Sequence, residues 1–444
     1  MPIDRNRDLT ATAQHNAAST DEPQRRYRSL DGVRGVAALV VLVHHSLLTI
    51  PALANPQLGS YHASGWAWWL TNTPVHTVWD GTEAVYVFFI LSGFVLMPRL
   101  TRSFAGWIGY YGARLTRLYL PVFAATAFAA VMFLAVQRTS RSNASWWVNS
   151  HVMTLTPSGV VRDAILIRGT DDLNGPLWSL KWEVLFSVLL PLYVLFSQAG
   201  RRFATLKFLG LVALIGTGLL DGRSDITYLP MFALGSLVAV ERDRLGVLFQ
   251  RLSGRSSRSF WFGTLVVVVV ALNAGWLVAA RGPQSEHVKN TALLVELLGA
   301  LGVVVLALYW PAAERLLEHR SAQWLGSRSF SLYLIHEPLV ISVALLLGPR
   351  WAPLTIVIAV PVSLLAADAF YRGVERPTHR LSRVLGEMVT KAATSDLSRA
   401  GRHAHLVSGQ RDLAPVVASD LRPVGPTKAR HRRPGQTNKI DDAR

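Results

Sequence analysis

LDGVRGVAALVVLVHH, the sequence of residues 30–45, places charged and titratable side chains inside an otherwise apolar helix. An Asp, Arg or His at the centre of a bilayer costs on the order of 2.5–3.5 kcal/mol, and such residues usually mark a substrate path or a proton-handling site. At 100° per residue, Arg34 and His45 lie about 20° from alignment, and Asp31 lies one turn before Arg34 on the same stripe, whereas His44 points elsewhere. The rise from Arg34 to His45 is about 16 Å, roughly half of a 30 Å hydrocarbon core. The stretch therefore predicts a membrane-spanning helix with a functional polar stripe.

The whole chain has the composition of a membrane protein. Of its 444 residues, 50% are hydrophobic and 16% are charged, which is too apolar for an ordinary soluble domain. Ten apolar runs are long enough, or nearly so, to cross a bilayer: 33–50, 82–98, 118–136, 178–196, 207–221, 226–240, 260–279, 291–310, 329–347 and 353–371. The fifth and sixth runs are short, and two tilted spans are favoured over a re-entrant hairpin. The sequence predicts an all-α integral membrane protein with about ten transmembrane helices.

The distribution of arginine predicts the orientation. Basic residues gather in alternate loops, and the loop at 51–79 has no Lys or Arg. Because basic loops stay on the cytoplasmic side, both termini are expected in the cytoplasm, with the chain spanning the plasma membrane. The same loops account for the net charge of +17 through anionic membrane lipids, so nucleic acid is not an expected partner. The chain has no cysteine, which excludes a disulfide framework and a thiol nucleophile.

Three segments are expected along the chain. Residues 1–28 are polar and aperiodic and predict a disordered cytoplasmic arm, and 29–377 form the ten-span domain. Residues 378–444 predict a basic, mostly disordered cytoplasmic tail that starts with a short amphipathic stretch. The loop at 138–177 carries Trp146, Trp147 and His151 and is long enough to form a partly ordered lid. No appended extracytoplasmic domain is expected, so a second-stage partner there is expected to be a separate chain.

Acidic residues recur in other spans. Glu183 lies about one and a half turns inside the fourth span, where a carboxylate needs a partner such as His45 or a substrate hydroxyl. A structural ion pair with Lys181 or an arginine is the alternative. In the second span, Glu83 lies near the outer interface, and Ser92 precedes a glycine in a pattern that also suits plain helix contact.

Two further features suit a polar ligand. Arg114 and Arg117 lie on one helical face at the mouth of the third span, where two guanidinium groups suit phosphate; membrane anchoring is the alternative. His336 is another intramembrane imidazole, with core hydrogen bonding as the alternative. The chain lacks the HxxxxD, Gly-x-Ser-x-Gly, Walker and His-Glu-x-x-His patterns, so no metal site is expected and the chemistry is expected inside the membrane.

Taken together, these motifs resemble the membrane-bound acyltransferase-3 family. The resemblance covers nearly the whole core and rests on an ordered set: LDGVRG with His45 after a ten-residue gap, FFILSGF at 88–94, the Arg114 and Arg117 pair, WSL at 178–180 with Glu183, SLYLIH at 331–336, and VERP at 374–377. The chain departs from the family pattern at Val184, where a second acidic residue is usual.

The resemblance implies an O-acyltransferase that moves an acyl group from cytoplasmic acyl-CoA, with acetyl-CoA as the expected donor, to a hydroxyl of a glycan, glycolipid or lipophilic metabolite. His45 is expected to act as general base. The other expected catalytic residues are Glu183 and Asp31; Arg34, Arg114 and Arg117 would hold the CoA phosphates; Glu83, Ser92, Trp178 and His336 would bind substrate. A transporter or flippase, and a non-catalytic membrane scaffold, are the alternatives from other functional classes.

Overall fold

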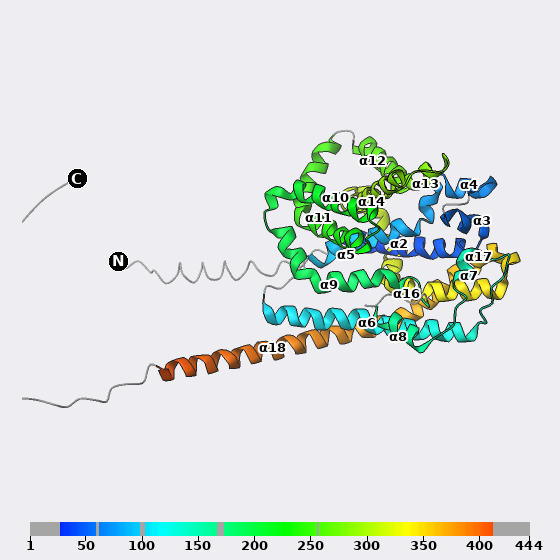
Figure 1. Cartoon of the computed structure of the whole chain (residues 1–444). Coiled ribbons are helices and arrows are strands. Elements are labelled where there is room, and N and C mark those ends of the chain that lie inside the picture. Colours follow the sequence, from blue (N-terminus) through cyan, green and yellow to red (C-terminus); the bar gives the residue numbers. More distant parts are fainter. Residues whose placement is uncertain (1–26, 59–61, 98–102, 167–172, 255–256, 412–444) are drawn as a thin grey trace, which may run out of the picture. The chain divides into compact units, whose positions relative to one another are not determined.

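The computed structural model describes residues 27–58, 62–97, 103–166, 173–254 and 257–411, with side chains up to residue 396. The described part is mainly helical and contains no strand (Figure 1). The long helices are α2 (Arg28–Leu47), α5 (Gly81–Leu96), α6 (Phe104–Ala135), α9 (Leu177–Gln198), α10 (Ala204–Leu220), α11 (Ser224–Ser253), α12 (Ser257–Leu272), α14 (Glu286–Tyr309), α16 (Arg320–Leu347), α17 (Ala352–Phe370) and α18 (Arg376–Arg411). The shorter helices include α7 (Trp146–Ser150), α8 (Pro157–Ile165), α13 (Ala274–Ala279) and α15 (Pro311–Leu317).

Nine of the ten predicted apolar runs fall mainly on one helix each, and the run 260–279 is divided between α12 and α13. Within the described residues, seven helices are long and apolar enough to cross a membrane, or up to eight if a bent pair forms one span. That pair is α11 and α12, which meet at 113°. The second run forms α5, whose 16 residues are fewer than the 18 taken as the minimum for a membrane span. The all-helical membrane architecture is confirmed, while the count of ten and the cytoplasmic termini stay predictions.

Glycines bring α2 into direct backbone contact with its neighbours. A Cβ atom on Gly32 would lie 2.2 Å from the carbonyl oxygen of Leu317, and one on Gly35 would lie 2.4 Å from the backbone nitrogen of Gly326. Reciprocally, a Cβ on Gly326 would lie 2.2 Å from the carbonyl oxygen of Asp31. Small residues permit such close helix packing in membranes. The two glycines of LDGVRG therefore fix the position of Arg34 relative to α15, through Gly32, and to α16, through Gly35.

A similar contact joins α5 to α11. A Cβ atom on Gly93 would lie 2.0 Å from the carbonyl oxygen of Phe232, and one on Gly235 would lie 1.9 Å from that of Ile90. The expected helix contact at the Ser92-Gly93 notch is therefore present at Gly93. Buried apolar side chains, including Phe186 of α9, fill the space around these two helices.

The chain continues from α17 into α18 through a π-helical segment, Tyr371–Glu375. Such segments are frequent at functional sites. Helix α18 includes the amphipathic stretch and extends to Arg411, so 376–411 is one helix where the sequence predicts a mostly disordered tail. Residues 1–26 and 412–444, which hold most of the expected arm and the end of the tail, lie outside the described residues.

Candidate functional site

Two cavities open along the same four helices, α2, α5, α9 and α16. The first, which we call the basic cavity, has a volume of about 640 Å³. It is lined by four arginines, one histidine and three carboxylates, together with neutral side chains. The titratable lining residues are Asp31, Arg34, Arg114, Arg117, Glu183, Glu375, His379 and Arg383. Five predicted site residues therefore share one cavity, with Ser92 also on its wall.

The second cavity, which we call the histidine cavity, has a volume of about 380 Å³. His45 and Trp178 line it, and so do Trp146, Trp147 and His151 of the predicted lid segment. His44, expected to point elsewhere, also lines this cavity, and its Nδ1 lies 2.9 Å from the carbonyl oxygen of Trp79.

About one helical turn separates the cavities along α16. Phe330 lines the basic cavity, and Tyr333, three residues later and about 4.5 Å further along the axis, lines the histidine cavity. The hydroxyls of Tyr333 and Ser179 lie 2.7 Å apart and join α16 to α9 at this level. A ligand that reached from one cavity into the other would have to pass this partition.

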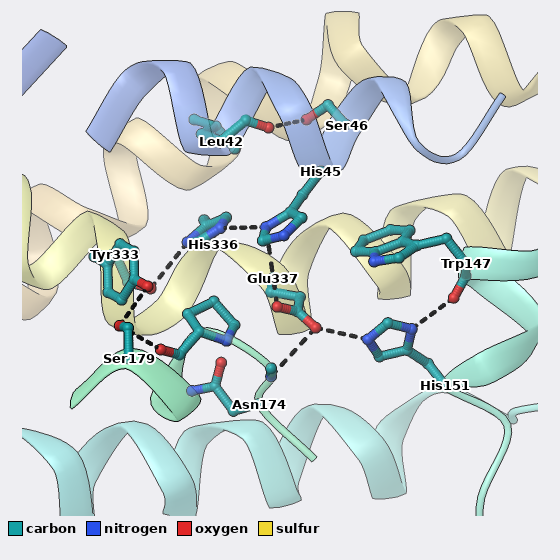
Figure 2. A network of polar contacts seen from close by, with 12 residues as sticks. Leu42, His45, Ser46, Trp147, His151, Asn174, Ser179, Tyr333, His336 and Glu337 are labelled. Atoms are coloured by element: carbon teal, nitrogen blue, oxygen red, sulfur yellow. Dashed lines mark hydrogen bonds and ion pairs between the residues drawn. The ribbon is translucent and has the colours of Figure 1, made fainter. Parts of the chain in front are cut away.

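His45 is held by a second histidine (Figure 2). Its Nδ1 lies 2.8 Å from Nε2 of His336, whose own Nδ1 lies 2.9 and 3.0 Å from the carbonyl oxygens of Leu332 and Tyr333. Because carbonyl oxygens only accept, Nδ1 of His336 carries a proton. Neutral His336 then accepts at Nε2, so His45 donates through Nδ1. Nε2 of His45 is left unprotonated, and among the described residues it has no hydrogen-bond partner.

Glu337 lies behind this histidine pair. Its Oε2 is 3.9 Å from Nδ1 of His45, and its Oε1 is 2.6 Å from Nε2 of His151 (Figure 2). The backbone nitrogen of Gly175 also donates to Oε1, at 3.3 Å, and a Cβ there would lie 2.7 Å from the carboxylate oxygens. The carboxylate is 4% exposed. The hydrogen bonds from two loop residues, His151 and Gly175, fix its position.

His151 lies in the loop between α6 and α9, at the end of α7. Its Nδ1 is 2.7 Å from the carbonyl oxygen of Trp147, whose indole stacks on the His45 ring with centroids 5.2 Å apart. Burial alone would lower the pKa of His151, but the hydrogen bond and negative charge of Glu337 outweigh it and raise the pKa above its usual value. The loop therefore contributes both a wall and a charge partner to the site.

Glu183 is placed differently from the expectation. Its Oε1 accepts a hydrogen bond from Nη2 of Arg114 at 2.6 Å, in the basic cavity. Lys181 lies over the ring of Trp182 instead. The structure thus has the alternative, an ion pair with an arginine, and the residue whose carboxylate lies near His45 is Glu337 rather than Glu183.

Arg34 differs from Arg114 in having no such neutralising contact. Its Nε is buried and has no hydrogen-bond partner, and among the described residues it forms no ion pair with a carboxylate. The Arg34 side chain as a whole is half-buried, but a buried N–H group without an acceptor is costly unless a ligand supplies one. The basic cavity is therefore suited to a ligand that carries negative charge.

Glu83 does not share either cavity. It lies on the other face of α5, where with Asp80 it borders an apolar cavity of about 480 Å³. Substrate binding by Glu83 stays a prediction, but the structure separates Glu83 from the other predicted site residues: Gly81 and Thr82 line the histidine cavity, whereas Glu83 lines the apolar one.

Sequence reasoning did not select Glu337, His151 or Glu375 as site residues. Glu337 was recognisable as an intramembrane carboxylate directly after His336, and His151 as a titratable residue in the predicted lid. Glu375, which accepts from Ser331 Oγ at 2.5 Å, lies in the VERP motif. Among the residues that the structure describes, no group of three or more His, Asp or Glu side chains could hold a metal ion.

Comparison with known proteins identifies the family of the chain. The family model for an acyltransferase domain, acyltransferase-3, matches residues 27–372. The chain is 22% identical over 395 residues to the O-acetyltransferase PaAT-1 of Phomopsis amygdali, covering 73% of this chain and 74% of that protein. No solved structure gives a significant match. The chain therefore belongs to the acyltransferase-3 family and is a membrane O-acyltransferase, as the resemblance of its motifs indicated.

Proposed function

We propose that this enzyme moves an acyl group from acyl-CoA, bound with its phosphates in the basic cavity, to an acceptor hydroxyl in the histidine cavity. The observation that carries the proposal is the hydrogen bonding of His45, from which its tautomer follows. Nδ1 is committed to His336 and Nε2 has no partner, on a side chain that lines a cavity and is 18% exposed. A neutral imidazole with a free nitrogen can act as a general base.

The proton balance of the step is simple. Nε2 of His45 takes the proton of the acceptor hydroxyl while that oxygen attacks the thioester carbonyl. The carbon–sulfur bond breaks, and the departing CoA thiolate takes the proton back from His45. The carboxylate of Glu337 stabilises the imidazolium in between, at 3.9 Å from Nδ1. His336 keeps the ring in the reactive tautomer, so we assign it and Glu337 as positioning residues.

The donor site follows from charge. Four arginines against three carboxylates leave the basic cavity positive. Guanidinium groups bind phosphate with paired hydrogen bonds, and the unpartnered Nε of Arg34 is available for one. Asp31 and Ser92 line the same cavity and would contact the donor rather than the acceptor. Because basic segments favour the cytoplasmic side, we place this cavity toward the cytoplasm.

The acceptor site is lined by aromatic side chains. Trp146, Trp147 and Trp178 border the histidine cavity, which suits the apolar faces of a sugar ring or a lipophilic metabolite. Acetyl is the acyl group that we propose, in line with the name of the relative. The thioester arm must pass the hydroxyl pair of Ser179 and Tyr333 to reach His45.

The test measures CoA release from radiolabelled acetyl-CoA by wild type and His45→Ala in nanodiscs, with a lipid and glycan extract of the host as acceptor pool. We expect label to move to an extract component with wild type alone. The matched control is His287→Ala, an exposed histidine on α14. Transfer by His45→Ala at the wild-type rate would overturn the assignment of the base. Failure of acetyl-CoA to bind wild type would overturn the assignment of the donor.

A further inference from the structure

We infer that the first turns of α18 form part of the donor site, and that Arg383 binds a phosphate group of the donor nucleotide. The inference rests on the proposed function of the basic cavity. Residues 376–390 lie beyond residue 372, where the acyltransferase match ends, and yet His379 and Arg383 line the same cavity as Arg34 and Arg117.

One anchor holds the start of α18 against α16. Glu375 accepts hydrogen bonds from the backbone nitrogen of Ser331 at 3.2 Å and from its hydroxyl at 2.5 Å. Nε2 of His379 lies 3.5 Å from the other carboxylate oxygen of Glu375. Through this carboxylate, the first turn of α18 is tied to the helix that carries His336.

A second anchor holds α18 against α6. A Cβ atom on Gly386 would lie 2.9 Å from the Cβ of Ala113 and 3.1 Å from the carbonyl oxygen of Gly109. A Cβ on Gly109 would clash in turn with the side chain of Thr390, which is less than 2 Å away. Helices that meet through glycine are held at close range. The contact lies on the turn of α6 that precedes Arg114.

Arg383 lies between the two anchors, four residues after His379 and three before Gly386. Its Nε donates to the carbonyl oxygen of His379 at 3.3 Å, which directs the guanidinium along the helix. Among the described residues, Arg383 forms no ion pair with a carboxylate, whereas Arg114 is paired with Glu183. Arg383 is therefore an exposed cation on the cavity wall, where a ligand in the cavity can reach it. Phosphate oxygens are the groups that guanidinium binds best.

The experiment compares Arg383→Gln with Arg380→Gln in the full-length protein in nanodiscs. Arg380 is an exposed arginine of the same helix that does not line the cavity. Calorimetry gives the Kd for CoA, and a transfer assay gives the KM for acetyl-CoA and kcat. We expect Arg383→Gln to weaken CoA binding and raise KM about tenfold, with kcat little changed, because a charge-assisted hydrogen bond is lost. Arg380→Gln is expected to match wild type.

Gly386→Leu provides a second variant, which keeps Arg383 but moves α18 away from α6. We expect it to weaken CoA binding while thermal unfolding stays cooperative. Wild-type affinity in Arg383→Gln, or equal weakening in Arg383→Gln and Arg380→Gln, would overturn the inference. Absence of CoA binding to wild type would instead remove the donor assignment itself, and the two failures are thereby distinguished.

Discussion

Nδ1 of His45 lies 2.8 Å from Nε2 of His336, although 291 positions separate the two residues in the chain. The contact joins the first long helix of the structure, α2, to α16. Backbone carbonyls fix the proton of His336 on Nδ1. His336 therefore accepts from Nδ1 of His45, which leaves Nε2 as the basic nitrogen of His45.

Removing His336 is expected to lower kcat with little change in KM for the donor. In His336→Ala, His45 loses its acceptor and no longer favours the tautomer with a free Nε2, so we expect a loss on the order of 10²- to 10⁴-fold, the range of general-base catalysis. His336→Gln keeps an acceptor oxygen and is expected to recover part of the rate. Steady-state kinetics in nanodiscs measures both variants. Unchanged kcat in His336→Ala, with unfolding at the wild-type temperature, would contradict the role.

Substitutions of Glu337 and of Glu183 are expected to change different kinetic constants. Glu337→Gln removes the charge near His45 and should lower kcat at unchanged donor KM. Glu183→Gln removes the partner of Arg114 and should alter donor KM without a comparable loss of kcat. Each variant is the other's control, since both lose one intramembrane carboxylate. The reverse pattern would return Glu183 to the role that the sequence suggested.

The His151–Glu337 pair is expected to make stability depend on pH. The pKa of His151 is raised in the folded protein, so the pair's contribution is fully present below the unfolded pKa of about 6.5 and is lost as pH rises through the folded value. We expect the midpoint temperature of thermal unfolding to fall as the pH rises from about 6.5 through the folded pKa of His151. In His151→Gln the fall should be absent. An identical slope in wild type and variant would show that other groups control it.

The backbone contact between α2 and α16 is expected to tolerate no added carbon. Gly326→Ala would place a Cβ 2.2 Å from the carbonyl oxygen of Asp31, and overpacking of this kind typically costs about 1–3 kcal/mol. Gly263→Ala on α12 meets no atom within 4 Å and serves as the control. The midpoint temperature of thermal unfolding should fall for Gly326→Ala and should stay equal or rise slightly for Gly263→Ala. Equal midpoints would mean that the two helices can move apart at little cost.

The sequence predicted features that depend on one helix at a time. Apolar runs marked the helices, and the polar stripe of α2 correctly placed Asp31, Arg34 and His45 on cavity walls. Which stripe faces which neighbour depends on packing between helices. The turn of α5 that directs Glu83 away from His45 and the pairing of Glu183 with Arg114 are therefore not encoded in local spacing.

The site residues that the sequence did not predict also depend on contacts between separate segments of the chain. Glu337 adjoins a predicted residue, but its importance depends on a loop, since His151 and Gly175 hold its carboxylate. A loop has no hydrophobic period from which its contacts could be predicted. The helical character of 378–411 was missed because its polar composition resembles that of disordered segments.

The glycine contacts between α2 and α16 give the two cavities a fixed spacing. Neither helix can slide along the other without bringing backbone atoms into collision, so Phe330 and Tyr333 of α16 keep their places along the cavities relative to Arg34 and His45 of α2. Transport by rocking of these two helices is thus disfavoured, and the acyl chain itself must travel. The passage is expected to open where α9 meets α16, at the hydroxyl pair of Ser179 and Tyr333, because α9 packs mainly on α11 and can shift while the rigid pair stays in place.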